Sequence, residues 1–163
     1  MIRYLIIMML LPLKLLSVNV DSFYPYVKQN FLFYQSDRVT AGGAGGGIGV
    51  RMNYNQNLFS ETDICILWGN GNSIPVTCAI GFQANGVWCP AVSLSSSVLL
   101  GQRTELLDQE GNLPSPFIYT INLKLQPFRF KHENKNVSFC DFALGMGPYK
   151  GNLLSLTMLS MEF

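Results

Sequence analysis

The chain of 163 residues is long enough for about one domain, and with 48% hydrophobic and 13% charged residues it is too apolar to be disordered. Eleven basic and ten acidic residues give a formal net charge of +1, which excludes the strongly basic surface that binding to a nucleic-acid backbone requires. Soluble domains usually contain about 25% charged residues, so the composition favours a membrane environment.

Residues 1–22 have the pattern of a secretory signal peptide. Arg3 supplies a positive charge, and an uncharged, mostly apolar run of ten residues separates it from Lys14. A membrane-spanning helix would need about 20 such residues. We therefore expect cleavage after Ser22 and export of a domain formed by residues 23–163. This domain is formally neutral, because cleavage removes two basic residues and one acidic residue from the totals of 11 and 10.

Alternation of apolar and polar residues with period two runs through the exported domain and predicts β-strands. It is clearest in segment 117–130, where every second residue from Phe117 to Leu125 is apolar. Eight such segments are expected, at about 24–34, 45–55, 60–69, 73–84, 87–101, 117–130, 137–146 and 153–163. Most are close to the roughly ten residues that a tilted strand needs to cross a bilayer. The predicted fold is therefore all-β, an eight-stranded antiparallel up-and-down transmembrane β-barrel.

Two connections between these segments are longer than the others, at about 35–44 and 102–116. With the first strand running outward from the periplasm, both fall on the outer side, where such barrels carry their longer loops. The glycine-rich run 42–49 lacks the spacing of a phosphate-binding loop. We expect it to form a loop tip that leads into the second strand.

The register of a hairpin can be tested, because residues that face each other across antiparallel strands must project to the same face of the sheet. A turn centred on Asn57 places Arg51 opposite Asp63 on the polar face. Three apolar pairs pass the same test, Val50 with Ile64, Ile66 with Val76, and Phe82 with Trp88. Charges in a narrow barrel interior are costly unless they are paired. We therefore expect an ion pair between Arg51 and Asp63, which Lys124 joins from the sixth strand.

The apolar face of the strands is expected to contact lipid. Aromatic residues near the strand ends should form girdles at the two membrane interfaces, namely Tyr54, Trp68, Trp88, Phe117, Tyr119 and Phe163. Four residues should lie near the middle of the bilayer, namely Ile66, Val76, Ile121 and Leu123. A soluble barrel would need the same alternation, but its polar face would be rich in Lys and Glu, whereas this one carries mainly small and amide side chains.

Four cysteines in an exported chain raise the question of disulfides. Their spacings contain no Cys-x-x-Cys motif, so a zinc site is not expected. In the predicted register Cys65 and Cys89 point inward and Cys78 points to lipid, and no two of them on neighbouring strands lie opposite each other. We expect free thiols that pack as small hydrophobic groups.

A signal peptide, eight alternating segments, Asn- and Gly-rich turns and a terminal Phe163 resemble the small outer-membrane β-barrels of Gram-negative-type bacteria. The resemblance implies that the barrel-insertion machinery reads the last strand and that the protein resides in the outer membrane. The last segment, 153–163, departs from clean alternation because both of its faces carry apolar side chains.

The only histidine, His132, lies in a segment that resembles the surroundings of the catalytic histidine in outer-membrane lipid A deacylases. The serine that this family carries two residues later is Asn134 here, so the implied nucleophile is missing. We expect His132 to be a turn residue.

Together these patterns predict a monomeric, non-enzymatic barrel without a cofactor or metal. Its role would be structural or surface display, through outer loops that contact lipopolysaccharide or host surface molecules. An eight-stranded barrel is filled by its own side chains, so passage of solutes is not expected. Two alternatives stay open: a barrel-embedded lipid A-modifying enzyme, and a soluble secreted binding barrel that resembles lipocalins.

Overall fold

Antiparallel strands form almost all of the structure, a computed structural model that describes residues 20–70, 72–101, 104–105, 117–132 and 135–163. The strands are β1 (Ser22–Gln35), β2 (Val39–Asn53), β3 (Leu58–Asn70), β4 (Ser73–Gln83), β5 (Ala91–Gly101), β6 (Thr104–Glu105), β7 (Ile118–Gln126), β8 (Phe128–His132), β9 (Lys135–Gly147) and β10 (Gly151–Glu162). The predicted signal peptide lies almost wholly outside the described residues. No helix in the described part of the chain is long and apolar enough to cross a membrane.

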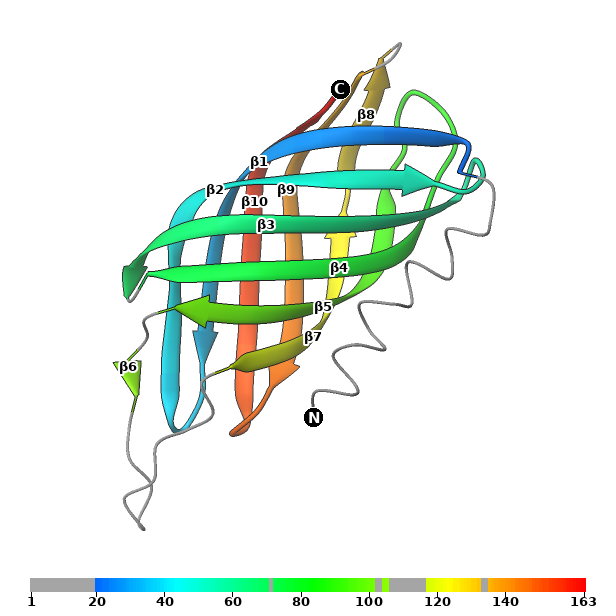
Figure 1. The fold of residues 1–163 in the computed structure, drawn as a ribbon. Helices are drawn as coiled ribbons and strands as arrows, with labels where there is room; N and C mark the ends of the chain where they lie inside the picture. Colours follow the sequence, from blue (N-terminus) through cyan, green and yellow to red (C-terminus); the bar gives the residue numbers. More distant parts are fainter. Residues whose placement is uncertain (1–19, 71, 102–103, 106–116, 133–134) are drawn as a thin grey trace.

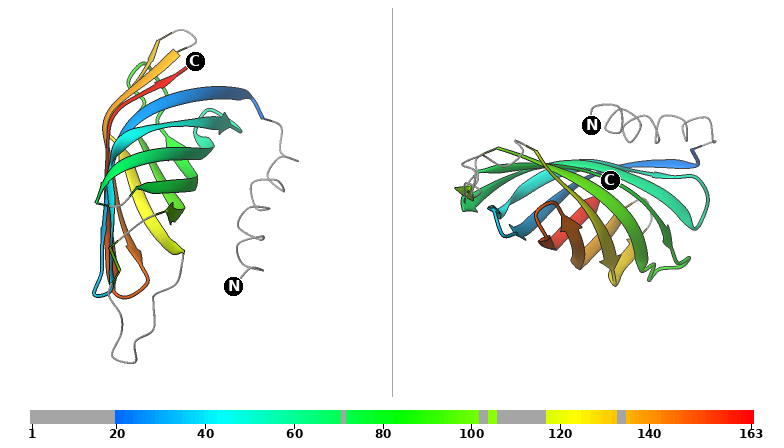
Figure 2. Two further views of the ribbon diagram at one scale, coloured as in Figure 1. Left: turned by 60° about the vertical axis from the view of Figure 1, so that its left-hand side comes forward. Right: turned by 90° about the horizontal axis from the view of Figure 1, so that it is seen from below.

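The wall is a closed barrel of eight strands, as predicted. β1 pairs with both β2 and β10, which closes the sheet on itself. β7 and β8 pair with β9 in one continuous register and are two parts of the same wall strand, interrupted at Pro127. β6 adds a two-residue pairing to the start of β2. The strands tilt strongly, so those at the front of Figure 1 cross those at the back (Figures 1 and 2).

The apolar residues of the alternating pattern face outward, which confirms most of the predicted outer wall. Eight of the ten residues assigned to it are exposed there, namely Ile66, Trp68, Trp88, Phe117, Tyr119, Ile121, Leu123 and Phe163. Val76 is half-buried. The prediction for Tyr54 is wrong, because its side chain is buried. β2 ends at Asn53, and the Tyr54 hydroxyl forms a hydrogen bond of 2.7 Å with the hydroxyl of Ser60.

The glycine-rich run 42–49 belongs to β2, so its prediction as a loop tip is wrong, and the expected loop 35–44 is reduced to a turn at 36–38. The inward positions of β2 include Gly47 and Gly49, whose missing side chains leave room in the lumen. A Cβ atom on Gly49 would lie 2.5 Å from Cζ of Tyr26. The run therefore makes space inside the barrel for the large side chains of neighbouring strands.

The hairpin registers differ from the predicted ones by an even number of residues. The observed partners are Thr62 for Val50, Glu61 for Arg51, Ile64 for Val76 and Val92 for Phe82. An even shift leaves every side chain on its predicted face, whereas an odd shift would exchange the faces. The first turn departs from the prediction because the Asn55 side-chain oxygen accepts hydrogen bonds from the backbone N–H groups of Asn57 and Leu58, at 2.8 and 2.6 Å.

Three neighbouring wall strands, β7–β8, β9 and β10, each contain one residue more than regular pairing needs. These extra residues lie side by side in a row across the sheet. Pro127, Cys140 and Met158 lie opposite one another in this row, and strand pairing is interrupted at all three. Cys140 has the left-handed φ of 53°. Such bulges exchange the inward and outward faces of the rest of each strand. The row explains why segment 153–163 has apolar residues on both apparent faces.

The lumen-facing glycines generate a stability prediction. Gly49→Ala should lower the free energy of unfolding by about 1–3 kcal/mol, because the added methyl overpacks against Tyr26 and Asp63. Gly46→Ala is the matched control on the same strand: its Cβ atom would meet nothing closer than a backbone oxygen at 3.7 Å. Urea unfolding of both variants in lipid vesicles measures the difference. Equal effects would contradict the assignment of Gly49 to the lumen.

Candidate functional site

The interior of the barrel is divided into layers along its axis. We call the end where β1 begins and β10 ends the terminal end, and the opposite end, with the turns at 36–38 and 148–150, the distal end. Apolar side chains fill the distal end, namely Leu32, Tyr34, Val39, Ala41, Cys65, Leu67, Leu99, Ile118 and Leu153. Because an eight-stranded barrel is only wide enough for its own side chains, this cluster closes the lumen at that end.

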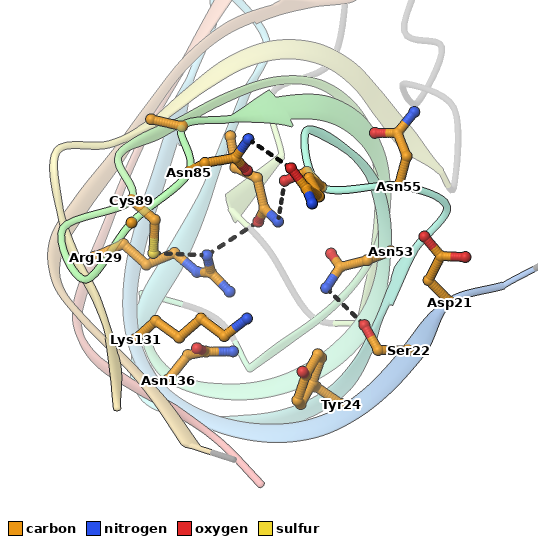
Figure 3. Close-up of a pocket in the computed structure, with 14 residues that line it drawn as sticks. Asp21, Ser22, Tyr24, Asn53, Asn55, Asn85, Cys89, Arg129, Lys131 and Asn136 are labelled. Carbon is orange, nitrogen blue, oxygen red and sulfur yellow. Dashed lines mark hydrogen bonds between the residues drawn. The ribbon is translucent and has the colours of Figure 1, made fainter. Parts of the chain in front are cut away.

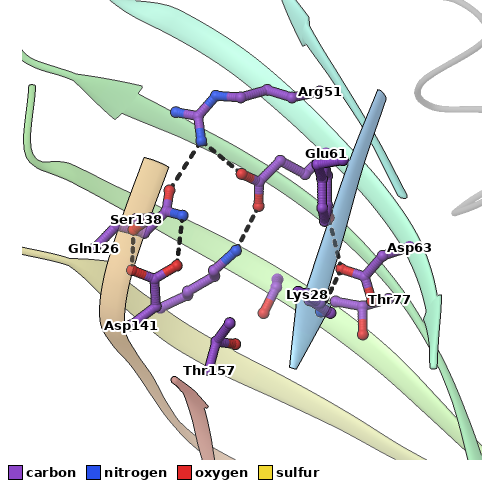
Figure 4. Close-up of polar contacts among 12 residues, drawn as sticks. Lys28, Arg51, Glu61, Asp63, Thr77, Gln126, Ser138, Asp141 and Thr157 are labelled. Atoms are coloured by element: carbon purple, nitrogen blue, oxygen red, sulfur yellow. Dashed lines mark hydrogen bonds and ion pairs between the residues drawn. The ribbon is translucent and has the colours of Figure 1, made fainter. Parts of the chain in front are cut away.

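Charged residues meet in the middle layer. Glu61 binds two cations, with 2.6 Å from its Oε1 to Nη1 of Arg51 and 2.7 Å from its Oε2 to Nζ of Lys124 (Figure 4). Asp63 binds Nζ of Lys28 at 2.8 Å. The structure thus places Arg51, Asp63 and Lys124 in the lumen, but the expected Arg51–Asp63 pair is corrected, since the shift of two residues in the register puts Glu61 opposite Arg51.

Lys28 and Glu61 are the charged partners of the predicted residues that the sequence analysis does not name, and the sequence marks them to different degrees. Glu61 has the same strand parity as Asp63, so alternation alone assigns it to the same inward face. Lys28 lies in the first strand, whose alternation is irregular in the sequence. Its place beside Asp63 depends on the register of the hairpin β1–β2, which sets Tyr26 and Lys28 opposite Gly49 and Gly47 of β2, so that their side chains reach β3.

Arg51 is the most enclosed charge of the middle layer, with no exposed surface. Its guanidinium lies over the Phe59 ring, 3.5 Å from the ring centroid, and donates hydrogen bonds to Oε1 of Gln126 at 2.9 Å and of Gln83 at 2.7 Å. A planar cation held by an aromatic face and several acceptors has one fixed orientation. Arg51 therefore links β2 to β3, β4 and β7.

A second arginine lies nearer the terminal end. Arg129 forms a bidentate pair with Glu162, with Nη2 to Oε2 at 2.7 Å and Nε to Oε1 at 3.1 Å. Its Nη1 also donates to Oε1 of Gln83 at 3.0 Å, so Gln83 joins the two arginines. Arg129 and Glu162 face inward because both lie beyond the row of bulges; without that row their strand parity would direct them outward.

The described lumen is electrically balanced. Its cations are Lys28, Arg51, Lys124 and Arg129, and its anions are Glu61, Asp63, Asp141 and Glu162. Asp141 accepts hydrogen bonds from Nε2 of Gln126 at 2.9 Å and from the Ser138 hydroxyl. Removal of a charge from water is costly, and a neutral, hydrogen-bonded network offsets that cost.

The lumen opens at the terminal end into a polar cavity of about 480 Å³, which we call the vestibule (Figure 3). Its wall includes Tyr24, Asn53, Asn85, Arg129 and Asn136. A separate gap of only about 40 Å³ lies in the middle layer. The interior is therefore accessible from the terminal end.

Other candidate groups lie apart from this network. His132 is exposed at the end of β8, and Asn134 falls outside the described residues. All four cysteines are free, with Cys65 and Cys89 buried as expected. The described residues hold no group of His, Cys, Asp and Glu that could bind a metal ion.

Comparison with known proteins identifies the fold. No protein-family model and no curated protein matches the chain. Among solved structures it is similar to Neisserial surface protein A (NspA), with a TM-score of 0.63 and 10% identity over 88% of this chain and 97% of that one. It is also similar to Ail, the attachment invasion locus protein of Yersinia pestis, in complex with the heparin analogue sucrose octasulfate, with a TM-score of 0.58 and 10% identity over 86% and 97%. The chain thus has the fold of small eight-stranded outer-membrane β-barrels.

The charge network can be tested by double-mutant cycles. Glu61→Gln should lower the free energy of unfolding by about 3–5 kcal/mol, because it leaves Arg51 and Lys124 without their shared carboxylate. Adding Lys124→Gln should cost less than the sum of the single changes, with a coupling of about 0.5–3 kcal/mol. Urea unfolding in vesicles gives the three values.

The same measurement distinguishes the observed register from the expected one. Asp63→Asn should couple with Lys28→Gln, its contact at 2.8 Å, and only weakly with Arg51→Met. Stronger coupling of Asp63 to Arg51 than to Lys28 would reject the observed pairing of β2 with β3.

Proposed function

We propose that the protein is a monomeric outer-membrane β-barrel, exported through a signal peptide at residues 1–22, that conducts no solutes and has a structural or surface-display role without enzyme activity. The observation that carries the proposal is the contrast between an apolar outer wall and a charged, compensated interior. This contrast is the reverse of a soluble barrel such as a lipocalin-like binder, which keeps its apolar side chains inside.

The outer wall fits a lipid bilayer in both composition and layout. Large aliphatic side chains such as Ile48, Ile64 and Leu123 are exposed along its middle. Aromatic side chains are exposed at both ends, including Trp68 and Phe117 at the distal end and Phe82, Phe128 and Phe163 at the terminal end. A soluble monomer rarely exposes so continuous an apolar surface, whereas membrane barrels carry an apolar band between two aromatic girdles.

The lumen supports a role other than transport. The apolar cluster at the distal end and the charge network behind it fill the path along the axis. In the orientation we propose, the terminal end faces the periplasm and the distal end faces outward. The connection between β5 and β7, at about 102–117, would then be the longest outward segment, of which the structure describes residues 104, 105 and 117.

Partners follow from this orientation. The outer wall would contact outer-membrane lipid, and the terminal strand β10 with Phe163 would be read by the barrel-insertion machinery. The distal surface would meet lipopolysaccharide or host surface molecules. Ail has been solved in complex with a heparin analogue. That complex supports our proposal that the partner of this chain is a sugar-containing molecule on the cell surface.

Placing a charge on the outer wall tests the membrane location. Leu123→Arg, at a position with 51% exposure in the middle of the wall, should lower the free energy of unfolding by about 2–4 kcal/mol in vesicles. Val87→Arg is the matched control, because Val87 is 74% exposed in the turn before β5 at the terminal end, outside the apolar band. Urea unfolding in vesicles measures the free energy of both variants. Partition into the detergent phase and heat-dependent mobility on a gel show that each starting protein is a folded barrel. Equal tolerance of the two arginines would reject the membrane-barrel proposal.

A further inference from the structure

We propose that two copies of this barrel associate side by side in the membrane through the outer face of β1 and β2, with Gln29 of each copy at the centre of the contact. The inference rests on the proposed membrane location and goes beyond the proposed function. There, one chain closes one barrel; here, two such complete monomers form a reversible pair. The contact uses neither the lumen nor residues 1–22.

Gln29 is a polar side chain in the middle of the apolar outer wall. It is exposed and lies near the middle of β1, between the exposed apolar side chains of Val27 and Phe31. Towards the two ends of the same strand face, Phe23 and Phe33 are exposed at the levels of the aromatic girdles. Of the described residues that face outward away from the strand ends, Gln29 is the only one with an amide or a charge.

The Gln29 amide forms no hydrogen bond with the described part of its own chain. Hydrocarbon offers neither donors nor acceptors, so an isolated amide there loses the hydrogen bonds that it makes in water. The bilayer core is about 30 Å thick, so its middle is about 15 Å from the headgroups, which is beyond the reach of a glutamine side chain. A protein partner in the membrane is the remaining source of a donor and an acceptor.

The wall next to Gln29 allows such a partner to come close. The residue opposite Gln29 on β2 is Gly46, and Ala44 faces outward two positions further along the strand, which lies beside β1 (Figure 1). A Cβ atom on Gly46 would meet nothing closer than the backbone oxygen of Lys28, at 3.7 Å, so the space above its backbone is open. Segments that associate within membranes combine small residues, which permit close approach, with polar side chains that form hydrogen bonds between the partners. Gln29 and Gly46 provide both.

A second copy of the same face satisfies Gln29 in both chains. A glutamine amide carries an acceptor and two donors, so it is complementary to itself. Both copies cross the membrane in the same direction, and a two-fold axis parallel to the membrane normal therefore places the two Gln29 side chains at the same depth. Each carbonyl oxygen then accepts a hydrogen bond from Nε2 of the other copy. The neighbouring outward side chains are apolar, including Ile48 on β2 and Leu159 on β10, so the axis brings no like charges together.

The opposite side of the barrel lacks this combination. Four strands away from β1, Ser96 of β5 lies opposite Cys78 of β4 in the middle of the wall. Both side chains are short and half-buried, and the Thr62 hydroxyl already donates to Sγ of Cys78 at 3.7 Å. A mid-wall polar side chain that reaches out from the barrel is therefore a feature of the β1 face.

The experiment is sedimentation equilibrium of the protein, purified in its folded form from the membrane, in density-matched detergent over a range of protein-to-detergent ratios. A reductant is present throughout, because Cys140 is exposed and free and disulfides must not contribute. We expect a monomer–dimer equilibrium that shifts to monomer as detergent is added. A protein that is monomeric at every ratio overturns the proposal. Heat-dependent mobility on a gel is scored separately, so this failure leaves the membrane-barrel proposal intact.

Variants locate the contact. Gln29→Leu should weaken the dimer by about tenfold through loss of the reciprocal hydrogen bonds, and Gly46→Leu by a similar factor because the new side chain fills the open space. Both changes place an apolar side chain against lipid, so the barrel should still fold. Ser96→Val is the matched control: it removes a polar group from the middle of the opposite wall and should leave the dimer unchanged. Unchanged dimerisation in Gln29→Leu or Gly46→Leu, or an equal loss in Ser96→Val, overturns the assignment.

Discussion

The narrow lumen of an eight-stranded barrel is the constraint on which the rest of this structure depends. A charged side chain inside it cannot reach bulk water, so each must meet an opposite charge within the barrel. Four cations and three of the four anions do so: Glu61 holds Arg51 and Lys124, Asp63 holds Lys28, and Glu162 holds Arg129. The fourth anion, Asp141, accepts hydrogen bonds from the neutral side chains of Gln126 and Ser138. The glycines of β2 make this network possible, because their missing side chains leave the volume that the side chains of β1 and β3 occupy.

The row of bulges contributes to this network as much as the ionic contacts do. By exchanging faces at Pro127, Cys140 and Met158, it turns the ends of three strands so that Arg129 and Glu162 enter the lumen. The same exchange orients Asn136 toward the vestibule. A small irregularity of the backbone thereby determines the chemistry of one whole end of the barrel.

Period two and composition were sufficient to predict the fold, the eight wall strands and the face of most side chains, because both depend only on parity along a strand. Period two and composition did not predict the register of the hairpins, because the register depends on the geometry of each turn. In the first of them, the Asn55 side chain accepts hydrogen bonds from the backbone of Asn57 and Leu58. The ion pair of Arg51 was therefore assigned to Asp63 although Glu61 has the same parity. The bulge of β10 does change the parity of the polar residues, from Ser155 and Thr157 to Ser160 and Glu162. A strict period-two pattern shows this change only as a loss of alternation, so it does not predict the bulge.

The filled distal end also has a thermodynamic consequence. An open pore exchanges solutes between the two compartments that it connects. A cavity that is closed at one end exchanges solutes with one compartment only. Whatever enters this lumen must leave by the same mouth, past Tyr24 and Asn53, so its occupancy is a function of the composition on that side only. In the orientation proposed above, that compartment is the periplasm, and the outer medium has no influence on what the lumen contains.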